Sequence, residues 1–211
     1  MVEKTDWDRA REARPMCSLY KLSANLRHLL PEAVGPIVGW HGPDTVDLPK
    51  IRPTNIAPIV VARDDGLHVF QGRWGFPPLP SSGSKTPIIN ARNLDSRFWR
   101  PHLGQRALIP TTGFCEWDAA KQPWWFEKED GGVFAFAGLY THLPDEPLPR
   151  FVIVTTAAEP PVVDEHPKAM PRVLPFNEGG LKWCKVGTGP TEAIYLHKKS
   201  ADGILTQHSL F

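Results

Sequence analysis

Short apolar runs separated by Gly, Pro and Asp dominate the chain after residue 55. The runs are rich in β-branched and aromatic residues, a composition typical of strands. The predicted strands are Ile56–Ala62, Leu67–Phe70, Ala107–Ile109, Gly113–Trp117, Trp124–Phe126, Val133–Leu139 and Phe151–Thr156. Strands and helices do not alternate regularly, which argues against a doubly wound parallel sheet. The pattern therefore predicts a single β-rich α+β domain with a curved, barrel-like, mostly antiparallel sheet.

Helical periodicity is confined to short segments. Ser23–Leu30 has a polar start followed by apolar residues on one face, so we expect a short amphipathic helix capped by Ser23. Asn177–Lys185 predicts a second helix, and Asn93–Trp99 predicts one or two helical turns. Gly35–Pro53 is rich in turn-forming residues.

Charge and cysteine content indicate which ligands and which cellular compartment to expect. The 211 residues include 24 basic and 23 acidic side chains, so any nucleic-acid binding would depend on a local basic patch. The cysteines Cys17, Cys115 and Cys184 lack metal-ligand spacing, and we expect neither a metal nor another cofactor. Their odd, low number fits a reducing compartment, and no apolar run approaches the ~20 residues of a membrane span. We therefore expect a cytoplasmic protein.

The first fifteen residues differ from the rest of the chain. They mix acidic and basic side chains without an apolar core, so they are not a secretory signal. We interpret residues 1–15 as a leader, residues 16–203 as the domain and residues 204–211 as a tail.

Four segments each carry one reactive group beside a turn or a strand end. Cys17 opens the domain; free cysteines are usually small buried hydrophobes, and reactivity needs an exposed, electropositive setting. Ile88–Arg92 presents Asn90 and Arg92, which in isolation would more often serve a turn and a surface ion pair.

The other two segments carry a carboxylate and an imidazole. Glu116 lies in an apolar, aromatic strand, where it either faces outward or is half-buried with a raised pKa suited to acid–base work. Trp117 beside it packs in the core or, less commonly, stacks on a base. His166 precedes Pro167 in a proline-rich loop and is a candidate catalytic residue, although a lone loop histidine is more often only a surface group. Together the four segments offer groups for covalent catalysis with acid–base assistance.

Taken in order, these segments resemble the SRAP family (SOS response-associated peptidase, or abasic-site processing proteins). The resemblance runs from Met16 to Leu174. It rests on the ordered motifs Met16-Cys17, Asn55–Pro58, Arg73–Gly75, Asn90–Arg92, Ile109–Trp117, Ala137–Tyr140, Val154–Ala158 and His166–Pro171.

The resemblance implies a protein that binds single-stranded DNA at abasic sites and forms a covalent thiazolidine with the opened sugar. It assigns catalytic roles to Cys17 as the N-terminal nucleophile, Asn90 as the positioning amide, Glu116 as the acid–base carboxylate and His166 as the acid that assists ring opening. It implies DNA contacts by Arg73, Trp74, Arg92, Trp117 and Thr155. It also implies a cytoplasmic, nucleoid-associated protein. Two other functions stay open: a cysteine-dependent peptidase that acts on its own leader, and a non-catalytic module that binds single-stranded DNA.

The sequence departs from the usual family pattern at two places. Ser18 and Leu19 replace the usual Gly-Arg, which removes one expected phosphate contact, and residues 177–203 do not align convincingly. A thiazolidine needs the α-amine of Cys17, so we expect the working chain to begin at Cys17, either through translation from Met16 or through removal of the leader.

The last residues of the chain suggest a second partner. Gln207–Phe211 resembles the short peptide that binds the bacterial sliding clamp, with Gln207, Leu210 and Phe211 as anchors; the alternative is a frayed terminus.

Overall fold

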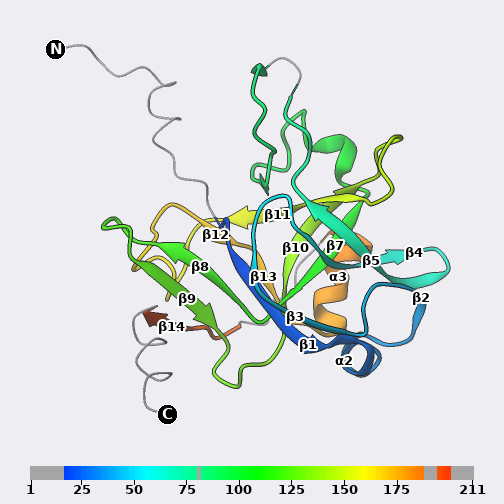
Figure 1. Ribbon diagram of the computed structural model, residues 1–211, viewed down its shortest axis with the longest axis horizontal. Helices are drawn as coiled ribbons and strands as arrows, with labels where there is room; N and C mark the ends of the chain where they lie inside the picture. Colours follow the sequence, from blue (N-terminus) through cyan, green and yellow to red (C-terminus); the bar gives the residue numbers. More distant parts are fainter. Residues whose placement is uncertain (1–16, 80–81, 188–193, 201–211) are drawn as a thin grey trace.

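The computed structural model describes residues 17–79, 82–187 and 194–200, and its strands form two sheets around one core (Figure 1). In spatial order, the first sheet contains β14 (His197–Ser200), β9 (Pro123–Glu127), β8 (Gly113–Trp117), β1 (Tyr20–Asn25) and β3 (Thr45–Ile51). The second contains β12 (Met170–Pro171), β11 (Arg150–Thr156), β10 (Phe134–Thr141), β7 (Arg106–Thr111), β4 (Ile56–Arg63), β5 (Gly66–Trp74) and β2 (Ile37–His41). Two short strands extend it, with β13 (Val173–Leu174) on β10 and β6 (Asn90–Ala91) on β11.

The second sheet closes on itself. Along the order β5-β4-β7-β10-β11 every neighbour is antiparallel, and β11 then pairs in parallel with β5 through Arg150 with Arg73 and Phe151 with Trp74. Closure satisfies the backbone groups that an open edge would expose. The predicted fold class, β-rich with a barrel-like and mostly antiparallel sheet, is confirmed.

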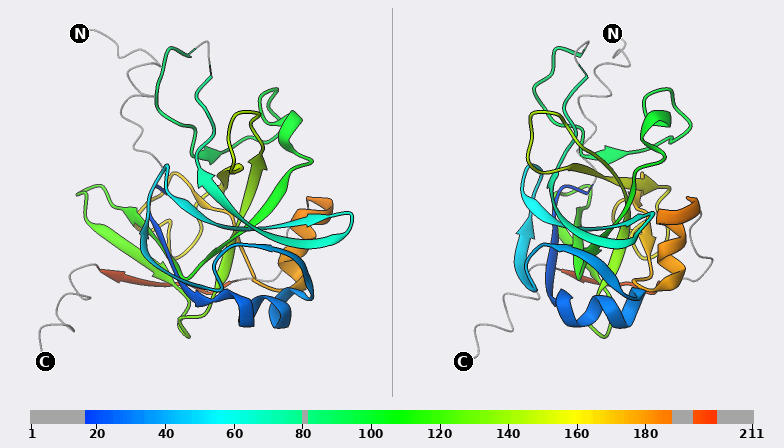
Figure 2. Two further views of the ribbon diagram at one scale, coloured as in Figure 1. Left: turned by 45° about the vertical axis from the view of Figure 1, so that its right-hand side comes forward. Right: turned by 90° about the vertical axis from the view of Figure 1, so that its right-hand side faces the viewer.

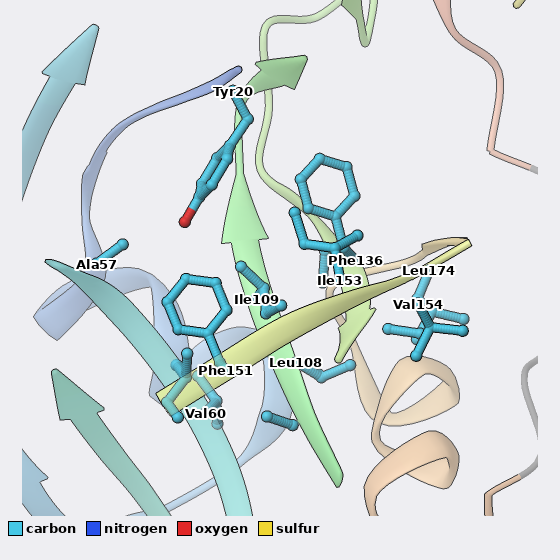
Figure 3. Packing of buried hydrophobic residues seen from close by; sticks show 14 of the residues in the cluster. Tyr20, Ala57, Val60, Leu108, Ile109, Phe136, Phe151, Ile153, Val154 and Leu174 are labelled. Atoms are coloured by element: carbon cyan, nitrogen blue, oxygen red, sulfur yellow. The ribbon is translucent and has the colours of Figure 1, made fainter. Parts of the chain in front are cut away.

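Aromatic side chains join the two sheets. The ring of Tyr20, from β1, lies 5.2 Å from that of Trp74 and 5.6 Å from that of Phe136, both edge to face. Figure 3 shows Tyr20 beside the aliphatic core of the barrel, which includes Ile109 and Ile153. These edge-to-face contacts hold the start of β1 against the closed sheet.

Within the described ranges two α-helices pack on the sheets, and the first begins later than expected. α2 (Leu26–Val34) is capped by Asn25, whose side chain accepts a hydrogen bond from the backbone N–H of His28. The predicted cap, Ser23, instead lies in β1 opposite Asp47, so that prediction is wrong. α3 (Glu178–Val186) confirms the helix predicted at Asn177–Lys185.

Other sequence-based assignments are confirmed or corrected by the sheet pairing. The seven predicted strands correspond to β4, β5, β7, β8, β9, β10 and β11. The turn-rich stretch Gly35–Pro53 contains β2 and β3, which pair along their lengths with β5 and β1. Asn93–Trp99 forms turns that lead into the short 3₁₀ helix η2 (Arg100–His102) rather than an α-helix.

Residues 76–79 and 82–88 connect β5 to β6 and project from the end of the barrel opposite α2 in both views of Figure 2. Among the described residues, no helix is both long and apolar enough to cross a membrane. The predicted leader and the predicted clamp-binding tail lie outside the described residues.

Candidate active site

Cys17 and Glu116 are in direct contact. Glu116 ends the buried part of β8, while Cys17 lies three residues before Tyr20, the first residue of β1. The two strands pair through Tyr20 and Phe114, and the N–H of Cys115 donates to the carbonyl of Leu19 at 2.9 Å. This pairing brings the backbone nitrogen of Cys17 to 2.9 Å from Oε1 of Glu116, to which it donates a hydrogen bond.

Glu116 faces the interior of the protein. It alternates with Phe114 on β8 and lies opposite Trp124 on β9, so all three side chains share one face of the sheet. Its side chain is almost fully buried, at 1% exposure. Burial raises the pKa of Glu116 to about 8, against the lowering effect of the N–H donated by Cys17. Of the two orientations open from the sequence, the structure shows the buried carboxyl with a raised pKa.

The thiol of Cys17 is held in its protonated form. Burial, reinforced by the charges of Glu116 and Cys115, raises the pKa of Cys17 well above its ordinary value. Cys115 itself has a pKa of about 12, and so does Cys184, in both cases mainly because of burial. The thiol of Cys17 therefore needs a nearby base to react, and Glu116 is the carboxylate in contact with that residue.

Asn90, Arg92 and Thr155 gather at one end of β11. Asn90 in β6 pairs with Ile153, and the hydroxyl of Thr155 donates to the carbonyl of Ala91 at 3.4 Å. Arg92 follows immediately after β6 and is exposed. One parallel strand pair thus brings Thr155 to Asn90 and Arg92, which lie more than 60 residues earlier in the sequence.

His166 lies in the loop that leads from β11 to β12. Its backbone N–H donates to the carbonyl of Val162 at 2.8 Å, and its Nδ1 lies 2.9 Å from the carbonyl oxygen of Ala169. A carbonyl oxygen only accepts hydrogen bonds, so Nδ1 carries a proton. The ring is thereby oriented, and Nε2 is the nitrogen that can exchange a proton with a substrate.

Two chains of contacts connect these groups across the sheets. On one side the ring of Tyr20 packs on Trp74, whose Nε1 donates to the carbonyl of Ile89, the residue before Asn90, at 3.0 Å. On the other, Lys198 of β14 packs over the ring of Trp124, the neighbour of Glu116, and donates to Glu165, the residue before His166. The first chain runs from Tyr20, three residues after Cys17, to the residue before Asn90. The second runs from Trp124, the strand partner of Glu116, to the residue before His166.

The remaining residues that were expected to contact DNA differ in how much of each side chain is exposed to solvent. Trp117 ends β8 and is half-buried, as is Arg73, whose guanidinium donates to the carbonyl of Thr54 at 3.0 Å. Trp74 is fully buried, so its ring contributes to packing and is not accessible for base stacking.

Lys198 and Trp124 were not among the sequence-based candidates. Lys198 lies in a polar stretch near the C-terminus that matches no motif. Trp124 is one of several aromatic residues in the predicted strands, and nothing in the sequence distinguishes it. Only the pairing of β14 with β9 places them beside the candidate residues.

Comparisons with known proteins agree with this fold. Solved structures with similar folds include two proteins from Bordetella bronchiseptica. The first is 20% identical with a TM-score of 0.65, covering 88% of this chain and 99% of its own. The second, a phage-related protein, is 20% identical with a TM-score of 0.62, covering 88% and 94%. A protein from Bacteroides thetaiotaomicron is 21% identical with a TM-score of 0.67, covering 87% and 91%.

Similarity at this level of identity shows a shared fold. Among curated proteins, none matches the chain significantly. The family model described as SOS response associated peptidase (SRAP) matches residues 16–207, nearly the whole chain. With Cys17, Glu116, Asn90 and His166 all inside the matched region, the chain belongs to the SRAP family.

Proposed function

We propose that this protein, in a form whose chain begins at Cys17, forms a covalent thiazolidine with abasic sites in single-stranded DNA. The observation that carries the proposal is the 2.9 Å contact between the nitrogen of Cys17 and Oε1 of Glu116. In a chain that begins at Cys17, this nitrogen is a free α-amine on the same residue as the thiol. The amine and the thiol are the two groups that a thiazolidine requires.

The protonation states of the pair suit this reaction. An amine attacks an aldehyde only when it is neutral, and an α-amine has an ordinary pKa of about 8. The pKa of Glu116 is also about 8. Transfer of a proton from the ammonium of Cys17 to the carboxylate of Glu116 is therefore nearly balanced in free energy, apart from the attraction between the two charges.

The reaction divides into steps that the described groups can serve. Opening of the closed abasic sugar moves one proton from the anomeric hydroxyl to the ring oxygen. Nε2 of His166, in the imidazolium form, gives a proton to the ring oxygen and recovers one from the anomeric hydroxyl. The amine of Cys17 adds to the aldehyde carbon, and Glu116 returns a proton as the hydroxyl leaves as water, which gives an imine. The thiol then adds to the imine carbon, its proton passes to the nitrogen, and a five-membered ring closes. One water is released overall.

Basic and aromatic groups near these residues support binding of a DNA strand. Arg92 is exposed beside Asn90, and Arg73 is half-buried on β5. Contacts of such side chains with phosphates position a strand without reading its sequence. The half-buried ring of Trp117, next to Glu116, offers a stacking surface that tolerates any base.

A crosslinking assay tests the proposal. Protein that begins at Cys17 is incubated with a single-stranded oligonucleotide that carries one abasic site, then heated in denaturant. We expect a heat-stable adduct on a gel, with a mass equal to protein plus DNA minus one water. The same oligonucleotide without the abasic site, and protein with one residue retained ahead of Cys17, should give no adduct. Failure of the parent protein to form any adduct would contradict the proposal.

Removal of the segment before Cys17 is a second candidate activity, favoured by the backbone at that residue. Cys17 has a φ of 33°, a left-handed conformation that costs roughly 1–2 kcal/mol for a non-glycine residue. Attack of its thiol on the carbonyl carbon of Met16 would form a thioester and break the peptide bond. Glu116 contacts the departing nitrogen and can deliver the thiol proton to it. Water then hydrolyses the thioester and restores the thiol.

Intact-mass measurement over time tests this second activity. Protein that carries residues 1–16 should lose them on incubation, leaving a chain that begins at Cys17. We expect roughly 100-fold slower loss in Glu116→Gln, because the departing nitrogen then lacks its proton donor. Equal rates for the parent and for Glu116→Gln would show that Glu116 is not the proton donor for this cleavage.

A further inference from the structure

Lys198 bridges two parts of the candidate site that lie far apart in sequence. Its Nζ donates to Oε1 of Glu165 at 2.8 Å and lies 3.5 Å from Oδ2 of Asp164, both in the loop that carries His166. The same Nζ lies 5.7 Å from the centre of the Trp124 ring, close enough for a cation–π contact. A single ammonium thus contacts the loop and the sheet together.

The strand pairing explains why Lys198 reaches the interior face. On β14, Lys198 lies opposite Phe126 of β9, and Trp124 is two residues along the same strand. Side chains two residues apart share a face, so Lys198 and Trp124 stand on the face that carries Glu116. The neighbouring Lys199 points to the opposite face.

The loop that Lys198 contacts is anchored by Val162, whose side chain is fully buried in the hydrophobic core four residues before His166. Its ends are held by the pairing of β11 with β12, through Thr155 with Pro171 and Thr156 with Met170. Between them, the described backbone hydrogen bonds are local, such as His166 to Val162. These bonds shape the loop around Val162, and Lys198 links the residues that follow, Asp164 and Glu165, to the ring of Trp124 on β9.

We propose that Lys198 is a positioning residue that holds the His166 loop against the face of β8 and β9 carrying Glu116. This inference rests on the proposed crosslinking function, in which the sugar must lie between the acid of His166 and the amine beside Glu116. Misplacement of one reacting group by about 1 Å can lower a rate by as much as 100-fold. Lys198 therefore acts on the rate through His166 and needs no contact with DNA.

The charges around Lys198 agree with a structural link rather than a phosphate site. Glu165 is nearly covered, with 16% of its side chain exposed, whereas that of Lys198 is 37% exposed. Hydrogen bonding to Glu165 raises the pKa of Lys198, so the bridge stays charged over the pH range of interest. Two carboxylates face one ammonium, which leaves the local charge negative and unfavourable for a phosphate.

Crosslinking kinetics and hydrogen exchange test the proposal on protein that begins at Cys17. Single-turnover rates are measured over a range of abasic DNA concentrations, giving a maximal rate and a half-saturating concentration. Lys198→Ala should lower the maximal rate roughly tenfold and leave the half-saturating concentration unchanged. Amide exchange in residues 162–166 should become roughly threefold to fivefold faster, because the loop opens more often.

Three further variants separate positioning from other roles. Lys198→Arg should retain most of the rate, because a guanidinium can make the same bridge. Lys199→Ala, the matched control on the opposite face, should behave as the parent protein. In a His166→Ala background, Lys198→Ala should cause no further loss, because both changes act on one step.

The possible outcomes are distinct. Unchanged exchange in residues 162–166 overturns the positioning role, whatever the parent protein does with DNA. A raised half-saturating concentration with an unchanged maximal rate overturns it in favour of a phosphate contact. A tenfold further loss in the His166→Ala background shows that Lys198 acts independently of His166. Absence of any adduct from the parent protein instead contradicts the proposed function.

Discussion

Replacement of Cys17 by Ala, in protein that begins at residue 17, should abolish the heat-stable adduct with abasic DNA. Alanine keeps the α-amine but lacks the thiol, so the reaction stops at the imine. An imine hydrolyses on heating, whereas a thiazolidine survives because its ring has closed. We expect a decrease in heat-stable product of at least roughly 1000-fold, as for removal of a covalent nucleophile.

Chemical trapping makes this prediction specific to the thiol. Reduction with borohydride before heating converts an imine into a stable secondary amine, so Cys17→Ala should give an adduct only when it is reduced. Cys115→Ala is the matched control, since Cys115 is adjacent to Glu116 and equally buried but lies outside the proposed chemistry. It should crosslink without reduction. Full crosslinking by Cys17→Ala without reduction would assign the reaction to another residue.

The strands that were predicted correctly are those whose own residues form a run of apolar side chains. β4 and β11 are nearly continuous apolar runs because the closed barrel covers them, and Pro149 directly precedes β11. β1 was missed because Leu26, Leu29 and Leu30 gave a helical period to the following segment, which drew the predicted start back to Ser23. β14 was missed because His197–Ser200 is polar and is a strand only through its pairing with β9.

The candidate site also contains residues that the sequence reveals and residues that only the strand pairing reveals. The sequence singled out Cys17, Asn90, Glu116 and His166 as candidates, and the family resemblance assigned their roles. Alternation along β8 gave Glu116 two orientations, and the choice between them depends on Phe114 and Trp124 packing inward across the strand pair. Lys198 carries no local signal, because its role follows only from the approach of β14 to the loop before His166.

The raised pKa of Glu116 leads to the second large prediction. In protein that begins at Cys17, Glu116→Gln should lower the crosslinking rate roughly 100-fold to 1000-fold at pH 7, because general acid–base assistance contributes about this much. The amide cannot take the proton of the ammonium or return one to the departing hydroxyl. Rates measured by single turnover on abasic DNA give the ratio directly.

The pH dependence of this ratio separates a proton-transfer role from a structural one. Below pH 8 the α-amine without its carboxylate partner is mostly ammonium, and its reactive fraction falls tenfold per pH unit. In the parent protein the neutral-amine fraction falls in the same way, because Glu116, whose pKa is about 8, is itself mostly protonated below that pH. The protonated carboxyl is the form that can return a proton to the departing hydroxyl. The ratio of parent to variant rates should therefore be level between pH 6 and pH 7 and shrink as the pH rises through 8 to 9, where the carboxyl loses this proton.

A matched carboxylate tests whether the effect belongs to this position. Glu127 lies on the opposite face of the same sheet, where Lys21 at 2.8 Å and Lys199 at 3.4 Å neutralise it. Glu127→Gln removes a buried carboxylate without altering the contact to Cys17, so its crosslinking rate and pH profile should match those of the parent. A constant ratio from pH 6 to 9 for Glu116→Gln would show that Glu116 only supports the structure. A ratio that shrinks as the pH rises through 8 identifies the protonated carboxyl of Glu116 as the acid that returns a proton to the departing hydroxyl.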